Sequence, residues 1–136
     1  MQDLIPAPRA QPRPERIELV MLILERQGRV LVCNSAALRL IPGSHALPVT
    51  ALSNGDSPGK AAAALARRIL GASTRLCAKA KIHHSITYRR LIAHLYYANV
   101  NFGDMDVPAP PDHQWRLRSD LDRLLTSALY RKALAA

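Results

Sequence analysis

The chain has 136 residues and a mass of 15.0 kDa, which is enough for one compact domain and a short tail. Lys and Arg number 19 against 10 Asp and Glu, so the formal net charge is +9 and the pI is about 10.4. A positive field of this size favours a polyanionic partner, although it would also serve solubility alone. The sequence contains no signal peptide and no apolar run near the ~20 residues that a membrane span requires, which predicts a cytoplasmic protein without a membrane partner.

The cysteines and the N-terminal segment give the first organisational clues. Cys33 and Cys77 are far apart and form no CxxC motif, which predicts a reduced intracellular protein without structural zinc. Residues 1–15 are rich in proline and arginine, and we expect a linker or tail there because proline resists helix and sheet. Such a linker would join a domain upstream, and an ordinary frayed terminus is the alternative. Residues 16–136 would then form the folded domain.

The first half of this domain is expected to begin with strands. An almost continuous apolar run over 17–24, the turn residues Gln27-Gly28 and a second apolar run over 29–33 predict a hairpin. The lack of alternation in the first run indicates a strand that is buried on both faces. A loop over 34–45 and a short strand over 47–52 follow.

The segment after residue 55 contains the clearest local signals in the chain. Asp56 and Ser57 are typical cap residues, Pro58 suits the first helical position, and Gly71 suits the position after the last turn. The sequence therefore predicts a helix over 58–71.

Two longer strands are expected next. Residues 74–82 alternate with a period of two, which predicts a half-buried strand. One side would carry Thr74, Leu76, Ala78, Ala80 and Ile82, and the other Arg75, Cys77, Lys79 and Lys81. A second strand is expected from about Ser85 to Val100, followed by a proline-rich loop over 101–113 and a short strand over 115–117.

The C-terminal segment predicts a final helix over 119–135. Ser119 is a typical cap, Asp120 and Asp122 suit a helix N-terminus, and an apolar stripe follows at Leu121, Leu124, Leu125 and Ala128. The whole order of elements predicts an α/β fold, with a mixed sheet and helices packed on its faces.

This order, with a strand–loop–helix unit that ends in glycine, resembles the Nudix fold, an α/β/α sandwich. The segment His84-Ser-Ile-Thr-Tyr88, continued through Tyr97, resembles the H-x-[FI]-[ST]-H-[FY] strand of the C-terminal domain of MutY-type adenine DNA glycosylases. Trp115 and the segment 125–134 are similar to the W…ALPS-x-x-K pattern that closes that domain, and the Pro/Arg-rich start is similar to its linker.

The resemblance implies a role for the tip between the two long strands. In that family the tip reaches into DNA and checks for 8-oxoguanine opposite a mispaired adenine. Carried over, Ile86 would be the apolar wedge and Thr87 the hydroxyl that hydrogen-bonds the damaged base. Tyr88 stands where the family has histidine, and tyrosine cannot supply the paired donor and acceptor of an imidazole.

The chemistry of a hydrolase or a glycosylase is not expected in this chain. An active Nudix helix needs several glutamates to hold Mg²⁺, but Leu65, Arg68 and Ile69 occupy those positions when the helix is aligned on Gly71. Two cysteines cannot ligate the iron–sulfur cluster of a glycosylase. His83 and His84 are adjacent on a strand and point to opposite faces. We therefore expect no metal, no cofactor and no catalysis by the isolated chain.

A basic stripe is the strongest physical signal. No Asp or Glu occurs between residues 57 and 103, and five basic side chains of that stretch are expected to form one patch across two paired strands: Arg75, Lys79, Lys81, Arg89 and Arg90. Such a patch would neutralise phosphates without recognising the nucleotide sequence. The alternative is a basic face that is only solvated and binds no partner.

These observations lead to two functional hypotheses. The first is a nucleoid-associated domain that binds duplex DNA containing 8-oxoguanine:A in base excision repair, beside a glycosylase catalytic domain located upstream or in trans. The second is a degenerate Nudix domain that acts as a protein-interaction or nucleotide-sensing module.

Overall fold

The computed structural model describes the backbone of residues 15–35, 41, 43–53, 55–86, 88–100 and 109–136. The expected linker over 1–15 lies outside these residues apart from Glu15, which begins the first strand. The strands are β1 (Glu15–Arg26), β2 (Arg29–Cys33), β3 (Val49–Ala51), β4 (Cys77–Ile86), β5 (Arg89–Asn99) and β6 (His113–Leu117). The helices are α2 (Pro58–Leu70), the 3-10 turn η2 (Arg118–Asp120), α3 (Leu121–Leu124) and α4 (Ala128–Ala135).

Strand β1 is the centre of the sheet. The strand order is β4-β5-β1-β2-β6, with β3 also paired to β1, and β1 runs parallel to β5 but antiparallel to β2 and β3. Every side chain from Leu19 to Leu24 is at most 1% exposed. The expectation of a strand buried on both faces is therefore confirmed, and the sheet is mixed.

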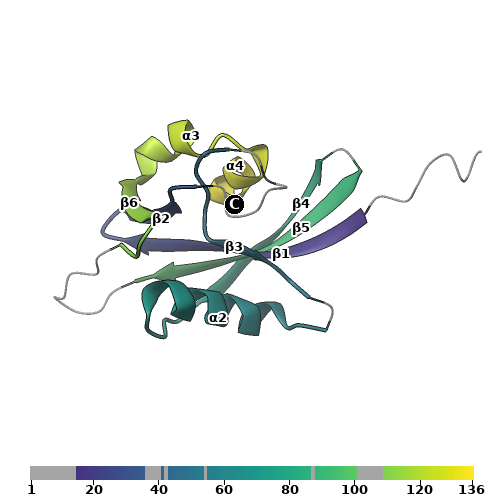
Figure 1. The fold of residues 1–136 in the computed structure, drawn as a ribbon, viewed down its shortest axis with the longest axis horizontal. Helices are drawn as coiled ribbons and strands as arrows, with labels where there is room; N and C mark the ends of the chain where they lie inside the picture. The colour runs from purple at the N-terminus through teal and green to yellow at the C-terminus, as the bar shows by residue number, and fades with distance from the viewer. Residues whose placement is uncertain (1–14, 36–40, 42, 54, 87, 101–108) are drawn as a thin grey trace, which may run out of the picture.

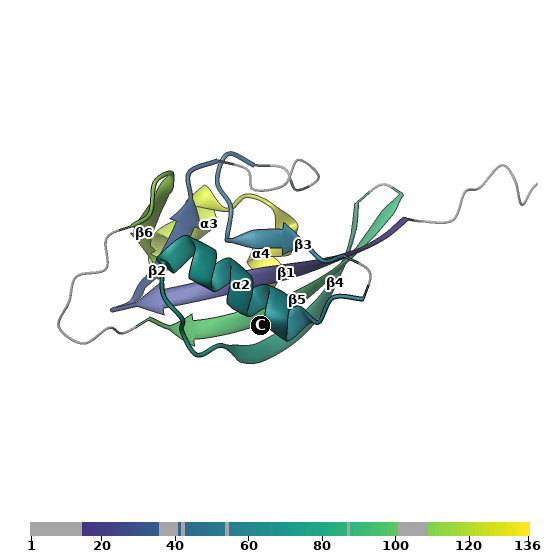
Figure 2. The ribbon, with the colours of Figure 1, turned by 60° about the horizontal axis from the view of Figure 1, so that its bottom comes forward.

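The two faces of the sheet are covered by different helices (Figure 1). Helix α2 packs on the face that carries Val20, Leu22 and Leu24, and it contributes Ala62, Leu65 and Ala66 to that core. Helices α3 and α4 cover the opposite face, which carries Leu19, Met21 and Ile23. Figure 2 shows α2 lying obliquely across β1 and β5. The α/β fold expected from the order of elements is thus present.

Local sequence signals explain why α2 and the first hairpin form where they do. Pro58 occupies the first turn of α2, and Gly71 ends the helix at φ 76°, from where its N–H donates to the Arg67 carbonyl at 2.8 Å. Gln27 and Gly28 connect β1 to β2 with φ values of 52° and 75°. Positive φ at both positions matches the twist of a two-residue hairpin loop.

The C-terminal region differs from the expected single helix over 119–135, and that prediction was wrong. Leu125 leaves the helical conformation at φ −100° and ψ 89°, and a new helix starts where the buried Ser127 hydroxyl accepts a hydrogen bond from the Leu129 N–H at 3.3 Å. The break lets Leu121, Leu125 and Leu129 all face the core, whereas Ala128 of the expected stripe is exposed.

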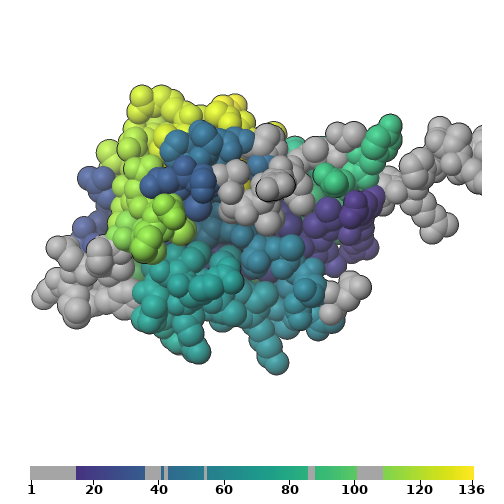
Figure 3. Space-filling view, viewed as in Figure 1, coloured from purple at the N-terminus to yellow at the C-terminus, as the bar shows by residue number. Residues whose placement is uncertain are grey.

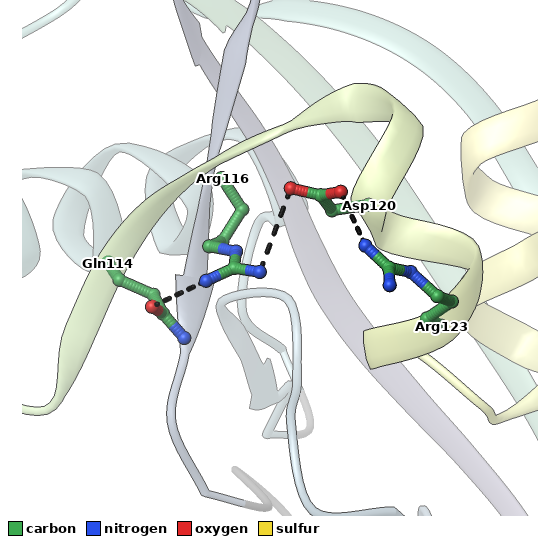
Figure 4. Close-up of polar contacts among 4 residues, drawn as sticks. All are labelled: Gln114, Arg116, Asp120 and Arg123. Atoms are coloured by element: carbon green, nitrogen blue, oxygen red, sulfur yellow. Dashed lines mark hydrogen bonds and ion pairs between the residues drawn. The ribbon is translucent and has the colours of Figure 1, made fainter.

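A small polar cluster holds the chain as it leaves β6 for α3 (Figure 4). The Asp120 carboxylate lies 3.6 Å from Arg116 Nη2 and accepts a hydrogen bond from Arg123 Nη2 at 2.8 Å. Arg116 also donates to Gln114 Oε1 at 3.4 Å. One carboxylate thereby ties a strand residue to the first helical turn that follows it.

None of the helices in the described part of the chain is long and apolar enough to cross a membrane.

Candidate nucleic-acid interface

The β4–β5 hairpin projects at one end of the molecule, and the first residues of β1 lie beside it (Figures 1 and 3). β4 ends at Ile86 and β5 starts at Arg89, so the tip of the hairpin lies between these residues. The resemblance to the MutY-type segment predicted this position, whereas the predicted strand bounds, with a second strand from Ser85, had placed the tip earlier in the chain. Tyr88 is 68% exposed. Its carbonyl accepts a hydrogen bond from the Glu15 N–H at 2.8 Å, which anchors the tip to β1. Thr87 and the side chain of Ile86 lie outside the described part of the chain.

The five basic residues of the expected patch do not share one face. Strand β4 begins only at Cys77, so Arg75 precedes it. A bulge between Ala78 and Ala80 then leaves Lys79 without a partner in the register of β5. The Lys79 ammonium lies 5.2 Å from the centre of the Tyr97 ring, whereas Lys81 is paired with His94. Tyr97 and His94 are three residues apart on β5, so they point to opposite faces of the sheet, and Lys79 and Lys81 therefore do the same. The expectation of a common face was wrong, because the bulge shifts the alternation of side chains along β4.

Arg89 and Arg90 are also separated, since they are consecutive on β5. Arg89 points to the side of Glu15 and forms an ion pair with it at 3.5 Å. Arg90 points to the other face, where its register partners are Ser85 on β4 and Arg16 on β1. The structure thus divides the predicted patch, and it adds Arg16, which sequence reasoning did not select.

The face that carries Arg90 continues across three strands, and we refer to its exposed members as the basic face. These members are Arg16, Lys81, His83, Ser85 and Arg90. They occupy the same sheet face as the α2 core but lie nearer the hairpin tip. Arg16 and Arg90 are direct register partners, and like charges placed opposite one another destabilise a sheet. Neither lies within ion-pair distance of a carboxylate among the described residues.

One carboxylate lies on this face of the three strands in their described part, and it already has a partner. Glu18 Oε1 accepts a hydrogen bond from His94 Nε2 at 2.9 Å. This hydrogen bond, helped by electrostatic attraction to Arg16, His94 and Lys81, holds the pKa of Glu18 below its ordinary value despite some desolvation. Glu18 is therefore ionised at neutral pH, and it offsets only part of the positive charge around it.

Helix α2 carries no carboxylate at any position. Leu65 is buried in the core, Arg68 is exposed and Ile69 is half-buried, so their side chains offer no oxygen ligand for a cation. Among the described residues, no three His, Cys, Asp or Glu side chains come close enough together to hold a metal ion. The described residues at the exposed end of the molecule offer cations, hydroxyls, imidazoles and one exposed phenol ring, and the two carboxylates beside them, Glu15 and Glu18, are already paired with Arg89 and His94.

No family model matches the sequence, and no curated protein matches it. Solved structures do match. The C-terminal domain of mouse MUTYH, solved in complex with human PCNA, superposes with a TM-score of 0.71 at 19% identity, over 88% of this chain and 85% of that one. A MutT protein from Methanosarcina mazei Go1 gives 0.70 at 15% identity, over 92% and 94%. A Nudix hydrolase from Nitrosomonas europaea gives 0.66 at 13% identity, over 89% and 87%.

This chain has a Nudix-like fold. At such identities the likeness establishes the architecture and not the reaction, since one fold is shared by a Nudix hydrolase, a MutT protein and the C-terminal domain of MUTYH. Within the Nudix-like fold, Arg16 was missed because it lies next to the Pro/Arg-rich segment and far from Arg90 in sequence. Only the parallel pairing of β1 with β5 brings the two arginines together, and no local signal reports that pairing.

Proposed function

We propose that this Nudix-like domain binds duplex DNA through the basic face and the neighbouring hairpin tip. The observation that carries the proposal is the placement of Arg16 opposite Arg90, on an exposed face beside the exposed ring of Tyr88. Neither arginine is paired with a carboxylate of the described residues, and two like charges in register cost stability in the free protein. A phosphate between them would convert that repulsion into two charge-assisted hydrogen bonds.

The proposed contacts divide into two kinds. Arg16, Lys81 and Arg90 would hold backbone phosphates and set the position of the domain, as cationic side chains commonly do on DNA. Arg75, Lys79 and Arg89 lie off this face, so we assign them at most a contribution to the surrounding field. Tyr88 would stack on a base, because an aromatic ring offers a sequence-tolerant platform.

The finer proposal is recognition of 8-oxoguanine opposite adenine by Ile86, Thr87 and Tyr88. It is supported by the resemblance of segment 84–97 to the MutY-type domain and by the shared fold of the MUTYH C-terminal domain. Because α2 carries no carboxylate, we also propose that the domain has no catalysis of its own and serves a glycosylase catalytic domain upstream or in trans.

The proposal is tested by fluorescence anisotropy on labelled duplexes at two salt concentrations, with either G:C or 8-oxoguanine:A at the centre. We expect Arg16→Gln and Arg90→Gln each to lower the salt slope by about one and to weaken both duplexes alike. Removing one of two like charges that face each other should at the same time leave the free protein equally stable or slightly more stable. Lys60→Gln and Arg68→Gln, exposed on α2, are matched controls with the same loss of charge.

Two outcomes would contradict the proposal at different levels. Equal affinity for the two duplexes would remove lesion recognition and leave general DNA binding. Equal losses for the basic-face variants and the α2 controls would show that only net charge matters. The alternative is a protein-interaction or nucleotide-sensing module, and the PCNA complex of the MUTYH neighbour supports the protein-interaction form of it. It predicts no DNA binding at low salt and a nucleotide-dependent or partner-dependent rise in Tm.

A further inference from the structure

A hollow of about 550 Å³ lies where the β4 edge of the sheet meets α4. β4 is the terminal strand in the sheet order, and α4 packs beside it. The described residues that line the hollow are His83, His84, Ser85, Arg90 and Lys132, and none of them carries a carboxylate. It therefore gathers cations and hydrogen-bond donors with no competing anion on its described walls.

Lys132 is held in place within this hollow although it lies on an exposed part of α4. Its ammonium donates to the carbonyl of His83 at 3.4 Å and approaches His84 Nδ1 at 3.0 Å. An ammonium has three N–H groups, so these two contacts leave one for a ligand. The long side chain is already ordered by contacts to β4, which reduces the entropy that a ligand would have to overcome.

The same contact determines which nitrogen of His84 carries the proton. Lysine is a donor only, so Nδ1 must accept, and the proton of the neutral ring is on Nε2. Burial, followed by the charge of Lys132, lowers the pKa of His84 below its ordinary value and keeps the ring neutral at physiological pH. The ring can therefore donate from Nε2 without adding a positive charge.

We propose that this hollow binds the dianionic phosphate of a monoester, with Lys132 and Arg90 as countercharges and Ser85 and His84 as neutral donors. Two positive charges match the charge of a monoester, which approaches −2 at neutral pH, better than that of a backbone diester. The phosphate could belong to a free nucleotide or to the phosphorylated end of a nucleic-acid strand. The hollow shares His83, Ser85 and Arg90 with the basic face. His84 and Lys132 lie outside that face, so a Lys132 variant tests this site separately from duplex binding.

The test uses the whole chain in an NMR titration that follows the His84 ring and the Ser85 amide at constant ionic strength. Inorganic phosphate should give saturable shifts at both, and a deoxynucleoside 5′-monophosphate should saturate where the nucleoside does not. Comparing a 5′-phosphorylated with a 5′-hydroxyl single strand distinguishes the two sources of the phosphate. Shifts that follow chloride as closely as phosphate would overturn the proposal.

Lys132→Met should weaken phosphate binding by tenfold or more, because charge-assisted hydrogen bonds are the strong ones. Lys132→Arg, which keeps the charge, should recover part of the affinity, and Ser85→Ala should cost a few-fold without touching α4. Lys60→Met is the control for the loss of one charge. If Lys132→Met binds phosphate as the parent does, the proposal is wrong. Duplex affinity that is retained in Lys132→Met separates this site from the basic face.

Discussion

Tyr88 presents an aromatic ring to solvent at the hairpin tip, 68% exposed, with its backbone tied to β1. Because most of this side chain is exposed to solvent, it contributes little to the free energy of unfolding. Its position in the sequence is where the MutY-type pattern has histidine. Substitutions of Tyr88 can therefore distinguish two proposed functions of the tip, namely general stacking on DNA and discrimination of a damaged base.

The substitution Tyr88→His should raise the preference for 8-oxoguanine:A over G:C, because imidazole restores a paired donor and acceptor at the tip. Tyr88→Ala should weaken both duplexes by roughly five-fold or more, since stacking of one base is worth about 1–3 kcal/mol. Both variants should unfold within about 0.5 kcal/mol of the parent. Anisotropy and chemical denaturation provide the measurements, and a Tyr88→Ala variant with unchanged affinity would remove the tip from the interface.

His84 gives the protein a defined response to acid. Its pKa is lowered from an ordinary value of 6.5, first by burial and then by the charge of Lys132, so the folded protein binds fewer protons at this site than the unfolded chain. Its stabilising contribution is thus complete above about pH 6.5 and is lost as the pH falls toward the folded-state pKa.

We expect His84→Asn to flatten this part of the pH profile, because the asparagine oxygen can still accept from Lys132 but does not titrate. The free energy of unfolding should be measured for both proteins at pH 7.5 and pH 5.5. The parent should lose more on acidification than the variant. Since the other histidines are common to both proteins, equal losses would show that His84 does not titrate as described.

The elements of this fold end and begin where side chains supply a local reason. The β4 bulge moves Lys79 over Tyr97, and the phenol of Tyr97 in turn donates to Glu25 Oε1 at 3.2 Å. The cap at Ser127 divides the C-terminal segment into two short helices. In both places the sequence pattern alone predicted a more regular element than the chain adopts.

Asp120 is the residue on which the β6–α3 junction depends. Asp120→Asn should lower the free energy of unfolding by about 1 kcal/mol, because two partly exposed arginine pairs are lost and surface pairs are worth little each. The loss should shrink in 1 M salt, which screens such pairs. Asp122→Asn, exposed on the next turn, is the matched control. Equal effects of the two substitutions would show that the cluster in Figure 4 has no special role.

At the scale of the whole molecule, β1 joins both cores. Leu22 is fully buried against the α2 layer, and Ile23, next to it, is 1% exposed against the α3–α4 layer. Consecutive residues of one strand thereby hold the two helical layers on a single sheet. Damage to either side should consequently affect the whole domain at once.

We expect Leu22→Ala and Ile23→Ala each to cost about 2–5 kcal/mol, through lost burial and the cavity left behind. Because a domain of this kind has roughly 5–15 kcal/mol in total, either change should lower the Tm strongly. Far-UV and near-UV circular dichroism should report one coincident transition for each variant. Loss of only one layer, seen as two separate transitions, would contradict the view of β1 as a shared centre.

The sequence by itself determined the central buried strand, the first hairpin, helix α2 with its terminal glycine, and the acid-free stretch that contains the basic residues. These features depend on local composition and periodicity, which act over a few neighbouring residues. Only the tertiary structure decided which basic side chains share a face, because the bulge at Lys79 and the parallel pairing of Arg16 with Arg90 join distant segments. The same holds for the hollow between β4 and α4, where Lys132 meets His84 through the packing of a helix on a sheet edge.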